Sequence, residues 1–478
     1  MLLNKLLEDI EVLENEETGN PDISLVCADS RKAVPGCMFV CLEGGADDGH
    51  LHIREAAEAG AVLAVVSKKP DGFSGLPLIY TSSTREAFAR LCNNICGRPT
   101  EKMKFFAVTG TNGKTSVAHL LRAVLTDAGY KSALIGTIGG NMTTPDPDLL
   151  YPLLEKLAGE DYDCVVMEAS SHALALKKLS PIHFEAGIFT NLTKDHGDFH
   201  KSVEAYFEAK ACLFKNCATG IFNIDDKYGN LLYNRRPCEK NISVSCTEGT
   251  DADYIAANVM SDIGGTRYEL IAQNKIFRIW TAMPWRFALY NSLETAACAS
   301  ACGVCHRFIQ SGISSVKCVS GRLENINPGG YFPGYPLIYI DYAHTPDALE
   351  NSLRALRSIM KPSERLTVIF GCGGDRDREK RPVMGKIASE LADRVILTED
   401  NSRSENREDI LAEIKSGIEN TEGVTEIPDR KKAIIYALSN SSKGDFLLLA
   451  GKGHENYIID YSGKHFFSEK KIIEDYYN

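Results

Sequence analysis

The stretch from residue 105 to residue 116 combines the residue types that bind a phosphate group. An apolar run rich in strand-forming residues leads into a glycine-containing turn, and residues 117–125 continue with apolar side chains at helical spacing. A strand, a tight turn and a helix start direct backbone N–H groups and the helix N-terminus at one point, which attracts phosphate. Lys114 supplies a cation for the terminal phosphates of a nucleotide, and the Thr115 hydroxyl group suits Mg²⁺. The predicted phosphate loop consists of Gly110, Thr111, Asn112, Gly113, Lys114, Thr115 and Ser116.

This loop matches the short motif G-x-x-G-K-[ST], which is less specific than the longer form G-x-x-x-x-G-K-[ST]. Val108 stands where the first glycine of the longer form would lie. The alternative interpretation is an ordinary glycine turn before a helix. The predicted strand before the turn and the predicted helix after it favour phosphate binding.

Two further segments carry groups that bind magnesium. Glu168 ends the apolar segment 162–168, which we expect to be a buried strand, and a carboxylate there can share Mg²⁺ with Thr115. Residues 190–198 (TNLTKDHGD) follow another predicted strand, and His196 is a candidate metal ligand among them. The alternatives are a surface glutamate at a strand end and a structural histidine.

Polar loops follow the predicted strands in the last third of the chain. They are residues 341–344, 371–377, 398–403 and 451–455. Ligands of doubly wound sheets bind in such loops, at the carboxyl ends of the strands. Arginine and carboxylate side chains occur together there, which suits a zwitterion, although each of them alone could be an exposed ion-pairing residue. The candidates are Arg381, Asp400, Arg403 and Glu455.

Alternating strands and helices divide the chain into three α/β units, at residues 1–98, 99–322 and 323–478. In the first unit we expect strands at 38–42 and 61–66 and a helix at 52–59. In the second unit, which holds the phosphate loop on a mostly parallel sheet, we expect strands at 132–136, 162–168 and 186–191, a helix at 149–157 and an additional β segment within 250–290. The third unit, a second doubly wound sheet, has predicted strands at 337–341, 366–370, 394–397 and 445–450 and predicted helices at 346–360, 383–392 and 407–419.

Length and charge exclude several classes of protein. The 478 residues are enough for about three domains, and a hydrophobic content of 44% is that of a globular protein. The net charge of −11 gives no overall attraction to nucleic acid. Residues 1–9 contain carboxylates where a signal peptide would be apolar, and no stretch is apolar enough to span a bilayer. We therefore expect a cytoplasmic protein that binds neither membranes nor nucleic acid, and we expect a monomer.

One cysteine group has the spacing of a cofactor site. Cys298, Cys302, Cys305 and His306 follow the pattern C-x3-C-x2-C-H, which can hold an iron–sulfur cluster or attach haem. The run from residue 295 to residue 302 is rich in alanine and is best explained as a buried helix that Gly303 ends. We therefore predict core packing rather than a metal, and reduced cysteines throughout.

Taken by themselves, these residues predict an ATP-dependent enzyme with its nucleotide between two α/β domains, and they leave the substrate open. Their motifs, read together, closely resemble those of the Mur ligases of peptidoglycan synthesis. The motifs are GTNGKT at 110–115, MEASSHAL at 167–174, DYAHTPDAL at 341–349 and FGCGGDRD at 370–377. The resemblance extends from residues 29–31 to residues 451–455, nearly the whole chain. Within the family, the chain is most similar to members that add the third residue to UDP-N-acetylmuramoyl-L-alanyl-D-glutamate.

The resemblance implies a mechanism and a magnesium site. ATP phosphorylates the free γ-carboxylate of D-glutamate, and an incoming amine attacks the acyl phosphate to give the amide, ADP and phosphate. Thr115, Glu168 and His196 match positions that bind magnesium in the family. Lys210 matches a lysine that is carbamylated, a change that converts a cation into a long carboxylate able to approach a second Mg²⁺. Without the resemblance, Lys210 would be interpreted as a solvated helix residue.

The resemblance also implies substrate contacts. Asn291 matches an adenine-contacting position, and Arg322 and Asp341 match the ATP-facing side of the hinge and the last domain. The positions that match contacts to the UDP-muramoyl dipeptide are Ser30, Thr143, Thr144, Ser170 and Lys178. Lys178 stands where the family usually has arginine, so the charge is kept and the bidentate fork is lost.

The third amino acid is predicted to be meso-diaminopimelate. Family members that use it carry Asp-Asn-Pro-Arg, and this chain has Asp400, Asn401, Ser402 and Arg403. The arginine that pairs with the distal carboxylate is present, whereas serine in place of proline loosens the loop. Arg381, Gly451 and Glu455 match further diaminopimelate contacts.

Three alternatives remain open at this point. The same reaction with lysine or another diamino acid is one of them, and a ligase similar to folylpolyglutamate synthetases, which share the fold and a similar phosphate loop, is another. A non-catalytic ATP-binding protein is the third. The presence of Lys114, Glu168, His196 and Lys210 together argues against the last alternative.

Overall fold

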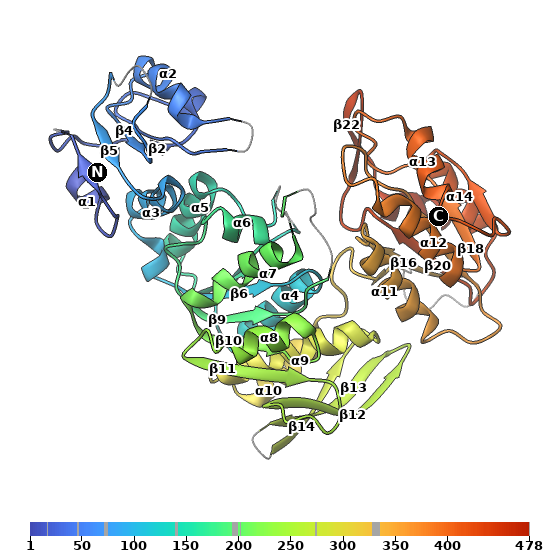
Figure 1. The fold of residues 1–478 in the computed structure, drawn as a ribbon. Helices are drawn as coiled ribbons and strands as arrows, with labels where there is room; N and C mark the ends of the chain where they lie inside the picture. Colours follow the sequence, from blue (N-terminus) through green and yellow to red (C-terminus); the bar gives the residue numbers. More distant parts are fainter. Residues whose placement is uncertain are drawn as a thin grey trace.

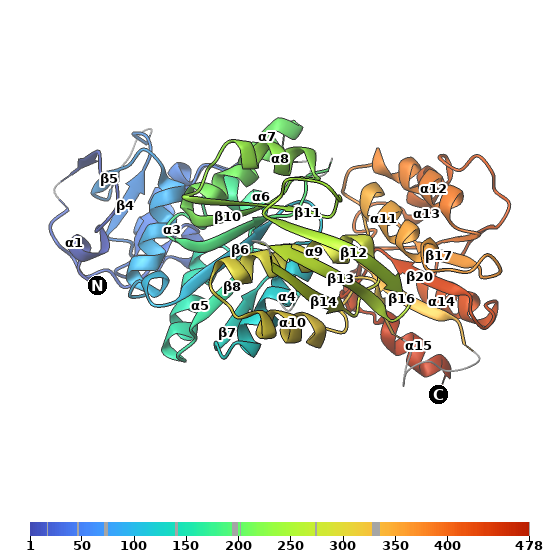
Figure 2. The same ribbon diagram turned by 90° about the horizontal axis from the view of Figure 1, so that it is seen from below.

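The computed structural model describes residues 1–16, 18–44, 47–70, 75–138, 142–193, 199–200, 202–272, 275–326 and 335–477. The chain forms an N-terminal, a central and a C-terminal unit, which follow one another in a row (Figures 1 and 2). Each unit is built around its own sheet, and these sheets have five, nine and six strands. The predicted α/β class and the three-domain organisation are therefore confirmed, while the limits of the domains at residues 98 and 322 stay predictions.

The N-terminal unit is a small, mostly parallel sheet. Its strands, in spatial order, are β1 (Glu14–Asn15), β5 (Leu78–Tyr80), β4 (Leu63–Val66), β3 (Met38–Val40) and β2 (Val26–Cys27), of which β1 alone is antiparallel to its neighbour. Its α-helices are α1 (Leu3–Leu6), α2 (Ile53–Glu58) and α3 (Thr84–Ile95). The strands and the helix that we predicted in this unit are present, with ends that agree within two residues.

The central sheet is parallel over most of its width and antiparallel at one edge. From that edge, its strands are β14 (Lys275–Thr281), β13 (Gly265–Ala272), β12 (Tyr254–Asp262), β11 (Lys240–Ser245), β10 (Cys217–Asn223), β9 (Phe184–Phe189), β6 (Lys104–Thr109), β8 (Cys164–Glu168) and β7 (Ser132–Ile135). The antiparallel strands β12 to β14 are the additional β segment expected within residues 250–290. The strand that leads into the phosphate loop, β6, is an interior strand of the sheet, between β9 and β8.

Alternating side chains of β6 pack into two different cores. Phe106 and Val108 face a core formed with α4 (Lys114–Asp127), α9 (Arg286–Ala301) and α10 (His306–Ser315). Phe105 and Ala107 face a second core, formed with α5 (Pro147–Gly159), α7 (Val203–Ala211) and α3 of the N-terminal unit. The remaining central helices are α6 (Ser171–Ala175) and α8 (Lys227–Asn234). The strand before the phosphate loop is thus held on both faces, which fixes the position of the loop.

The alanine-rich segment with the clustered cysteines is a buried helix, as predicted. Cys298 belongs to the core around α9, and Gly303 follows the helix end with a φ of +83°. Among the residues that the structure describes, these cysteines form no group able to share a metal ion. The group that does lie close enough, Glu43, Asp48 and His50, is already neutralised in part, because Lys68 pairs with both carboxylates.

The C-terminal unit is a doubly wound sheet. Its strands, in spatial order, are β15 (Glu324–Asn325), β16 (Leu337–Asp341), β20 (Phe446–Ala450), β17 (Leu366–Phe370), β18 (Arg394–Leu397) and β19 (Val424–Glu426), and β15 alone is antiparallel. One face packs against α11 (Pro346–Arg357), α12 (Lys380–Leu391) and α13 (Arg407–Lys415), and the other against α14 (Arg430–Ser439) and α15 (Glu469–Tyr477). A hairpin of β21 (Tyr457–Asp460) and β22 (Gly463–Phe466) extends from this unit. None of the described helices is long and apolar enough to cross a lipid bilayer.

Candidate active site

The predicted phosphate loop is the connection between β6 and α4, and two of its glycines have no room for a side chain. Gly110 has a φ of +147°, and a Cβ atom there would collide with Oγ1 of Thr190. Gly113 has a φ of +90°, and its Cβ atom would lie 2.7 Å from Oδ1 of Asn291. Both positions therefore require glycine, and the resulting turn places the N-terminus of α4 at the end of the central sheet.

Two lysine side chains converge on the carbonyl oxygen of Gly110. Nζ of Lys114 donates hydrogen bonds to the carbonyl oxygens of Gly110 and Thr111, at 3.0 and 2.9 Å. Nζ of Lys210, on α7, donates to the same oxygen of Gly110 at 2.6 Å, and the Lys210 side chain is only 1% exposed. The tertiary structure thus buries Lys210 beside the phosphate loop, whereas the sequence pattern alone would place it in solvent.

A carboxylate and a hydroxyl group beside the loop form an oxygen-rich pair. Oγ1 of Thr115 donates to Oε2 of Glu168 at 2.8 Å, and Glu168 is 1% exposed. The backbone N–H of Thr137 donates to the other oxygen of Glu168, at 2.8 Å. Oxygen ligands of this kind are those that Mg²⁺ prefers, so the donor set fits the predicted magnesium site. The third predicted ligand, His196, lies outside the described residues.

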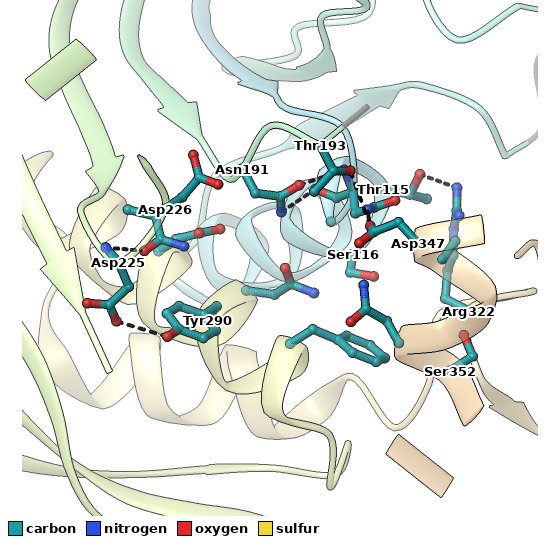
Figure 3. A pocket seen from close by; sticks show the side chains of 18 of the residues that line it. Thr115, Ser116, Asn191, Thr193, Asp225, Asp226, Tyr290, Arg322, Asp347 and Ser352 are labelled. Carbon is teal, nitrogen blue, oxygen red and sulfur yellow. Dashed lines mark hydrogen bonds between the residues drawn. The ribbon is translucent and has the colours of Figure 1, made fainter. Parts of the chain in front are cut away.

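A cavity of about 330 Å³ adjoins the phosphate loop, between the central and C-terminal units (Figure 3). Its walls come from the phosphate loop, from the segment between β10 and α8, from α9 and from the segment that begins α11. The cavity brings together seven of the predicted ATP-site residues, from the phosphate loop and from three later positions in the chain: Asn112, Gly113, Thr115, Ser116, Asn291, Arg322 and Asp341. Asp341 accepts hydrogen bonds from the backbone N–H groups of Leu323 and Ala343, and its burial raises the pKa of its carboxyl group.

Hydrogen bonds link opposite walls of the cavity, and those to Asp347 join the central and C-terminal units. Nη2 of Arg322 donates to Oγ1 of Thr115 at 3.0 Å, and Nδ2 of Asn112 donates to Oδ2 of Asp347 at 2.6 Å. Thr193 also donates to Oδ2 of Asp347, at 3.2 Å (Figure 3). Sequence reasoning overlooked Asp347, although it lies at the start of a predicted helix in the motif DYAHTPDAL. Its burial, which raises the pKa of the carboxyl group, became apparent only in the tertiary structure.

The residues expected to bind the UDP-muramoyl dipeptide lie where the central unit faces the N-terminal unit. Thr144 donates to the carbonyl oxygen of Glu168 at 2.8 Å, and its Oγ1 atom lies 3.2 Å from Oγ of Ser170. Oγ1 of Thr143 lies 3.0 Å from Oγ1 of Thr137. Lys178 is buried and pairs with Asp146 at 2.6 Å.

Ser30 lies in the N-terminal unit, where its hydroxyl group donates to Glu55 at 2.9 Å. The neighbouring Lys32 reaches across to Asp148 of the central unit, at 2.6 Å. Ser30 is thus brought to the interface between the two units, on the side where Lys178 and Asp146 form their ion pair.

The polar loops of the C-terminal unit meet around one buried lysine. Lys452 has a side chain without solvent exposure, and its Nζ atom lies 3.3 Å from Asp400, 3.1 Å from Asn401 and 3.4 Å from Glu455. Burial would raise the pKa of Asp400, but the Lys452 cation, with Arg430, holds it below its usual value. Gly451 has a φ of +109°, and a Cβ atom there would lie 2.6 Å from Oδ2 of Asp400. Lys452 was overlooked by sequence reasoning, although its loop was recognised.

The two predicted arginines have different surroundings. Arg381 has no exposed side-chain surface, and its guanidinium group binds both oxygens of Glu405 and one oxygen of Glu413. Arg403 donates to the carbonyl oxygens of Gly374 and Asn401, and no carboxylate among the described residues forms an ion pair with it. Ser402, beside it, is buried. Arg403 therefore forms no ion pair with a described carboxylate, although the carboxylate of Asp375 lies near enough to interact with its charge.

A buried arginine that sequence reasoning missed, Arg430, connects the ends of β18 and β20. Arg430 is fully buried; it pairs with Glu469 at 2.8 Å and donates to the carbonyl oxygens of Glu399 and Ala450, which directly precede Asp400 and Gly451. We expect Arg430→Ala to lower the free energy of unfolding by about 3–5 kcal/mol, because it leaves a buried carboxylate and two carbonyl groups without their donor. Denaturation in urea measures the change.

The matched control is the next residue along α14. Lys431 is exposed, so Lys431→Ala should change the free energy of unfolding by less than about 0.5 kcal/mol. An Arg430→Ala protein as stable as the Lys431→Ala protein would show that Arg430 does not hold these loops.

Comparison with known proteins identifies the family. The profile of the Mur ligase middle domain matches residues 108–299, and that of the Mur ligase glutamate ligase domain matches residues 321–453. The chain is 38% identical to the UDP-N-acetylmuramoyl-L-alanyl-D-glutamate–2,6-diaminopimelate ligase of Caldanaerobacter subterraneus, with 98% of each chain covered. It is 37% identical to the ligase of the same name from Clostridioides difficile, with 99% of each chain covered.

Solved structures show the same architecture. A structure of a UDP-N-acetylmuramoyl-L-alanyl-D-glutamate–2,6-diaminopimelate ligase superimposes with a TM-score of 0.70 at 28% identity, covering 100% of this chain and 99% of that one. Folylpolyglutamate synthase of Mycobacterium tuberculosis shares the fold alone, with a TM-score of 0.61 at 15% identity over 75% of this chain and 91% of that one. The full-length similarity is thus to Mur ligases. The chain belongs to the Mur ligase family, as an ATP-dependent ligase of the MurE type that functions in peptidoglycan precursor synthesis.

Proposed function

We propose that this chain joins meso-diaminopimelate to the D-glutamate of UDP-N-acetylmuramoyl-L-alanyl-D-glutamate. The observation that carries this assignment is the Arg403 guanidinium group, which two carbonyl oxygens hold in place and which forms no ion pair with a described carboxylate. Diaminopimelate has a distal carboxylate that such a group can bind through paired hydrogen bonds, whereas lysine has none. The names of the full-length relatives support the same substrate.

The diamino acid would be held by the loops around Lys452. Asp400 and Glu455 offer carboxylates for the ammonium groups of the substrate, and Asn401 is fixed between Lys452 and Glu455 by hydrogen bonds of 3.1 and 3.0 Å. Arg381 pairs with Glu405, two residues beyond Arg403 in the chain. Gly451 leaves the Asp400 carboxylate a space that a larger residue at position 451 would occupy. We propose that Ser402 and Arg403 complete the site on the side of the distal carboxylate.

In the proposed reaction, the γ-carboxylate of D-glutamate attacks the γ-phosphorus of ATP, which releases ADP and leaves an acyl phosphate. The amine of diaminopimelate then adds to the acyl carbon, and the resulting tetrahedral intermediate expels phosphate to leave the amide. Lys114 and the N-terminus of α4 stabilise negative charge on the phosphates. Thr115 and Glu168, with His196, would hold Mg²⁺, which offsets further charge when bound. Lys210 is proposed to be carbamylated, which would replace its cation by a carboxylate.

The UDP-muramoyl dipeptide is proposed to bind between the N-terminal and central units. Ser30, Thr143, Thr144 and Ser170 would supply hydroxyl groups on that side. Lys178, which pairs with Asp146 at 2.6 Å, is proposed to supply a cation for the substrate anions. We also propose that the reaction takes place in the cytoplasm, where ATP is available.

A panel of amino acids tests the assignment. Purified enzyme is supplied with ATP, Mg²⁺ and the UDP-muramoyl dipeptide, together with meso-diaminopimelate, L-lysine or L-ornithine. ADP release and the mass of the nucleotide product are measured. We expect kcat/KM to be at least about a hundredfold higher for diaminopimelate, from the paired hydrogen bonds to its distal carboxylate. A preference for lysine or ornithine would assign the chain to ligases with another third residue.

A further inference from the structure

The cavity between the central and C-terminal units has two chemically different ends. Thr115 and Arg322 lie at one end, and Asp225, Asp226 and Tyr290 lie at the other (Figure 3). The phosphate loop fixes the first end as the place of the phosphates. The base of the nucleotide must therefore lie toward the second end, along α9.

Two of the three carboxyl groups at the second end already have hydrogen-bond donors. Asp225 accepts from the hydroxyl groups of Ser245 and Tyr290, at 2.7 and 2.9 Å, and from the backbone N–H of Cys246. Asp226 caps α8 and accepts from two backbone N–H groups of its first turn, at 3.0 and 2.8 Å. These two carboxyl groups thus already accept hydrogen bonds from the protein within the wall of the cavity.

The third carboxyl group, that of Glu294, has no such donor in the part of the chain that the structure describes. Glu294 lies on α9 one turn beyond Asn291, lines the cavity and is only 1% exposed. Its Oε2 atom has no hydrogen-bond partner among the described residues. Burial raises the pKa of the Glu294 carboxyl group, and the nearby Asp226 raises it further. A buried carboxyl group without a donor is unfavourable unless a ligand supplies one.

We propose that Glu294 recognises the base of the nucleotide, with a carboxyl oxygen that accepts a hydrogen bond from the exocyclic amino group of adenine. Phe287 and Tyr290 are half-buried aromatic side chains on the same helix, and they offer an apolar surface to a planar ring. Glu294 is then a specificity-determining residue of the ligation reaction. The inference rests on the nucleotide site proposed above.

Purine riboside triphosphate, which lacks the amino group of adenine, provides the test. In the wild-type enzyme we expect KM for this analogue to be about tenfold higher than KM for ATP, because one hydrogen bond is lost and a buried acceptor stays unpaired. In Glu294→Ala the two KM values should agree within about twofold. Glu294→Leu fills most of the same volume without an acceptor, and its two KM values should also agree within about twofold. Glu294→Gln keeps an acceptor, so its ratio of the two KM values should be that of the wild type.

Glu155, an exposed glutamate of α5, is the control position. Glu155→Ala should leave both KM values as in the wild type, and thermal denaturation confirms that each variant is folded. A wild-type enzyme that does not distinguish the nucleotides, or Glu294→Ala and Glu294→Leu enzymes that keep the full ratio, would overturn the inference while ATP turnover still supports the nucleotide site. Failure of the wild type to bind either nucleotide would overturn the site itself.

Discussion

We expect the Lys114→Ala variant to lose about a thousandfold in kcat/KM, the largest catalytic effect among the substitutions considered. Lys114 lies at the N-terminus of α4, and its Nζ atom donates a hydrogen bond to the Gly110 carbonyl oxygen at 3.0 Å. A cation there stabilises the charge that develops on the transferred phosphoryl group, and alanine removes it without a replacement. Initial rates of ADP release with the UDP-muramoyl dipeptide and diaminopimelate measure the loss.

Lys104 provides the matched control for this experiment. It is an exposed lysine at the other end of β6, so Lys104→Ala removes the same charge from the same strand without approaching the phosphates. Its kcat/KM should stay within about twofold of the wild type. A Lys114→Ala enzyme with comparable activity would show that residues 110–116 do not hold the reacting phosphate.

The second large effect is expected at Arg403, in binding rather than in catalysis. We expect Arg403→Ala to raise KM for meso-diaminopimelate by about a hundredfold and to leave KM for ATP unchanged, because a charge-assisted pair of hydrogen bonds is lost. Arg403→Lys keeps the charge without the fork and should have an intermediate KM. Arg403→Ala should also lose the discrimination between the two amino acids, so that lysine and diaminopimelate react with similar kcat/KM. Steady-state kinetics with each amino acid provides the measurement.

Arg376 serves as the control for Arg403. It is exposed on a neighbouring loop, where its guanidinium group donates to the carbonyl oxygen of Asp375. Arg376→Ala should leave KM for diaminopimelate within about twofold of the wild type. If Arg403→Ala has the KM of the wild type, Arg403 does not contact the distal carboxylate and the assignment to diaminopimelate loses its main support.

Much of the fold was predictable because its signals are local. The apolar runs that became β8, β16, β17, β18 and β20, and the helical spacing that became α4, α5 and α11, are periodic over a few residues, and periodicity follows directly from helix and strand geometry. Elements with weaker patterns, such as the β21–β22 hairpin and α14, had no local signal strong enough to be predicted. The phosphate loop was predictable for the same reason as the strong elements, since its glycines, lysine and threonine act within one turn.

The order of the strands decided which groups that are distant in sequence lie close together in space. Thr115 and Glu168 lie 2.8 Å apart because β6 and β8 are neighbours in the sheet, although β7 and α5 separate them in sequence. In the same way, β16, β17, β18 and β20 align their carboxyl ends, and this alignment brings Asp400 to Lys452. Sequence reasoning named Thr115, Glu168 and Asp400, but their distances depend on a sheet order that no local pattern specifies.

The sequence by itself determined the family, the three α/β units and the chemistry of the phosphate loop, because these depend on residue types at short spacing. The tertiary structure alone decided which charged side chains are buried. Lys210, Glu294 and Lys452 are polar residues that any local pattern places in solvent, yet each is at most 1% exposed. Their burial results from the packing of elements far apart in the chain, and packing sets both the cost of a buried charge and the partner that offsets it.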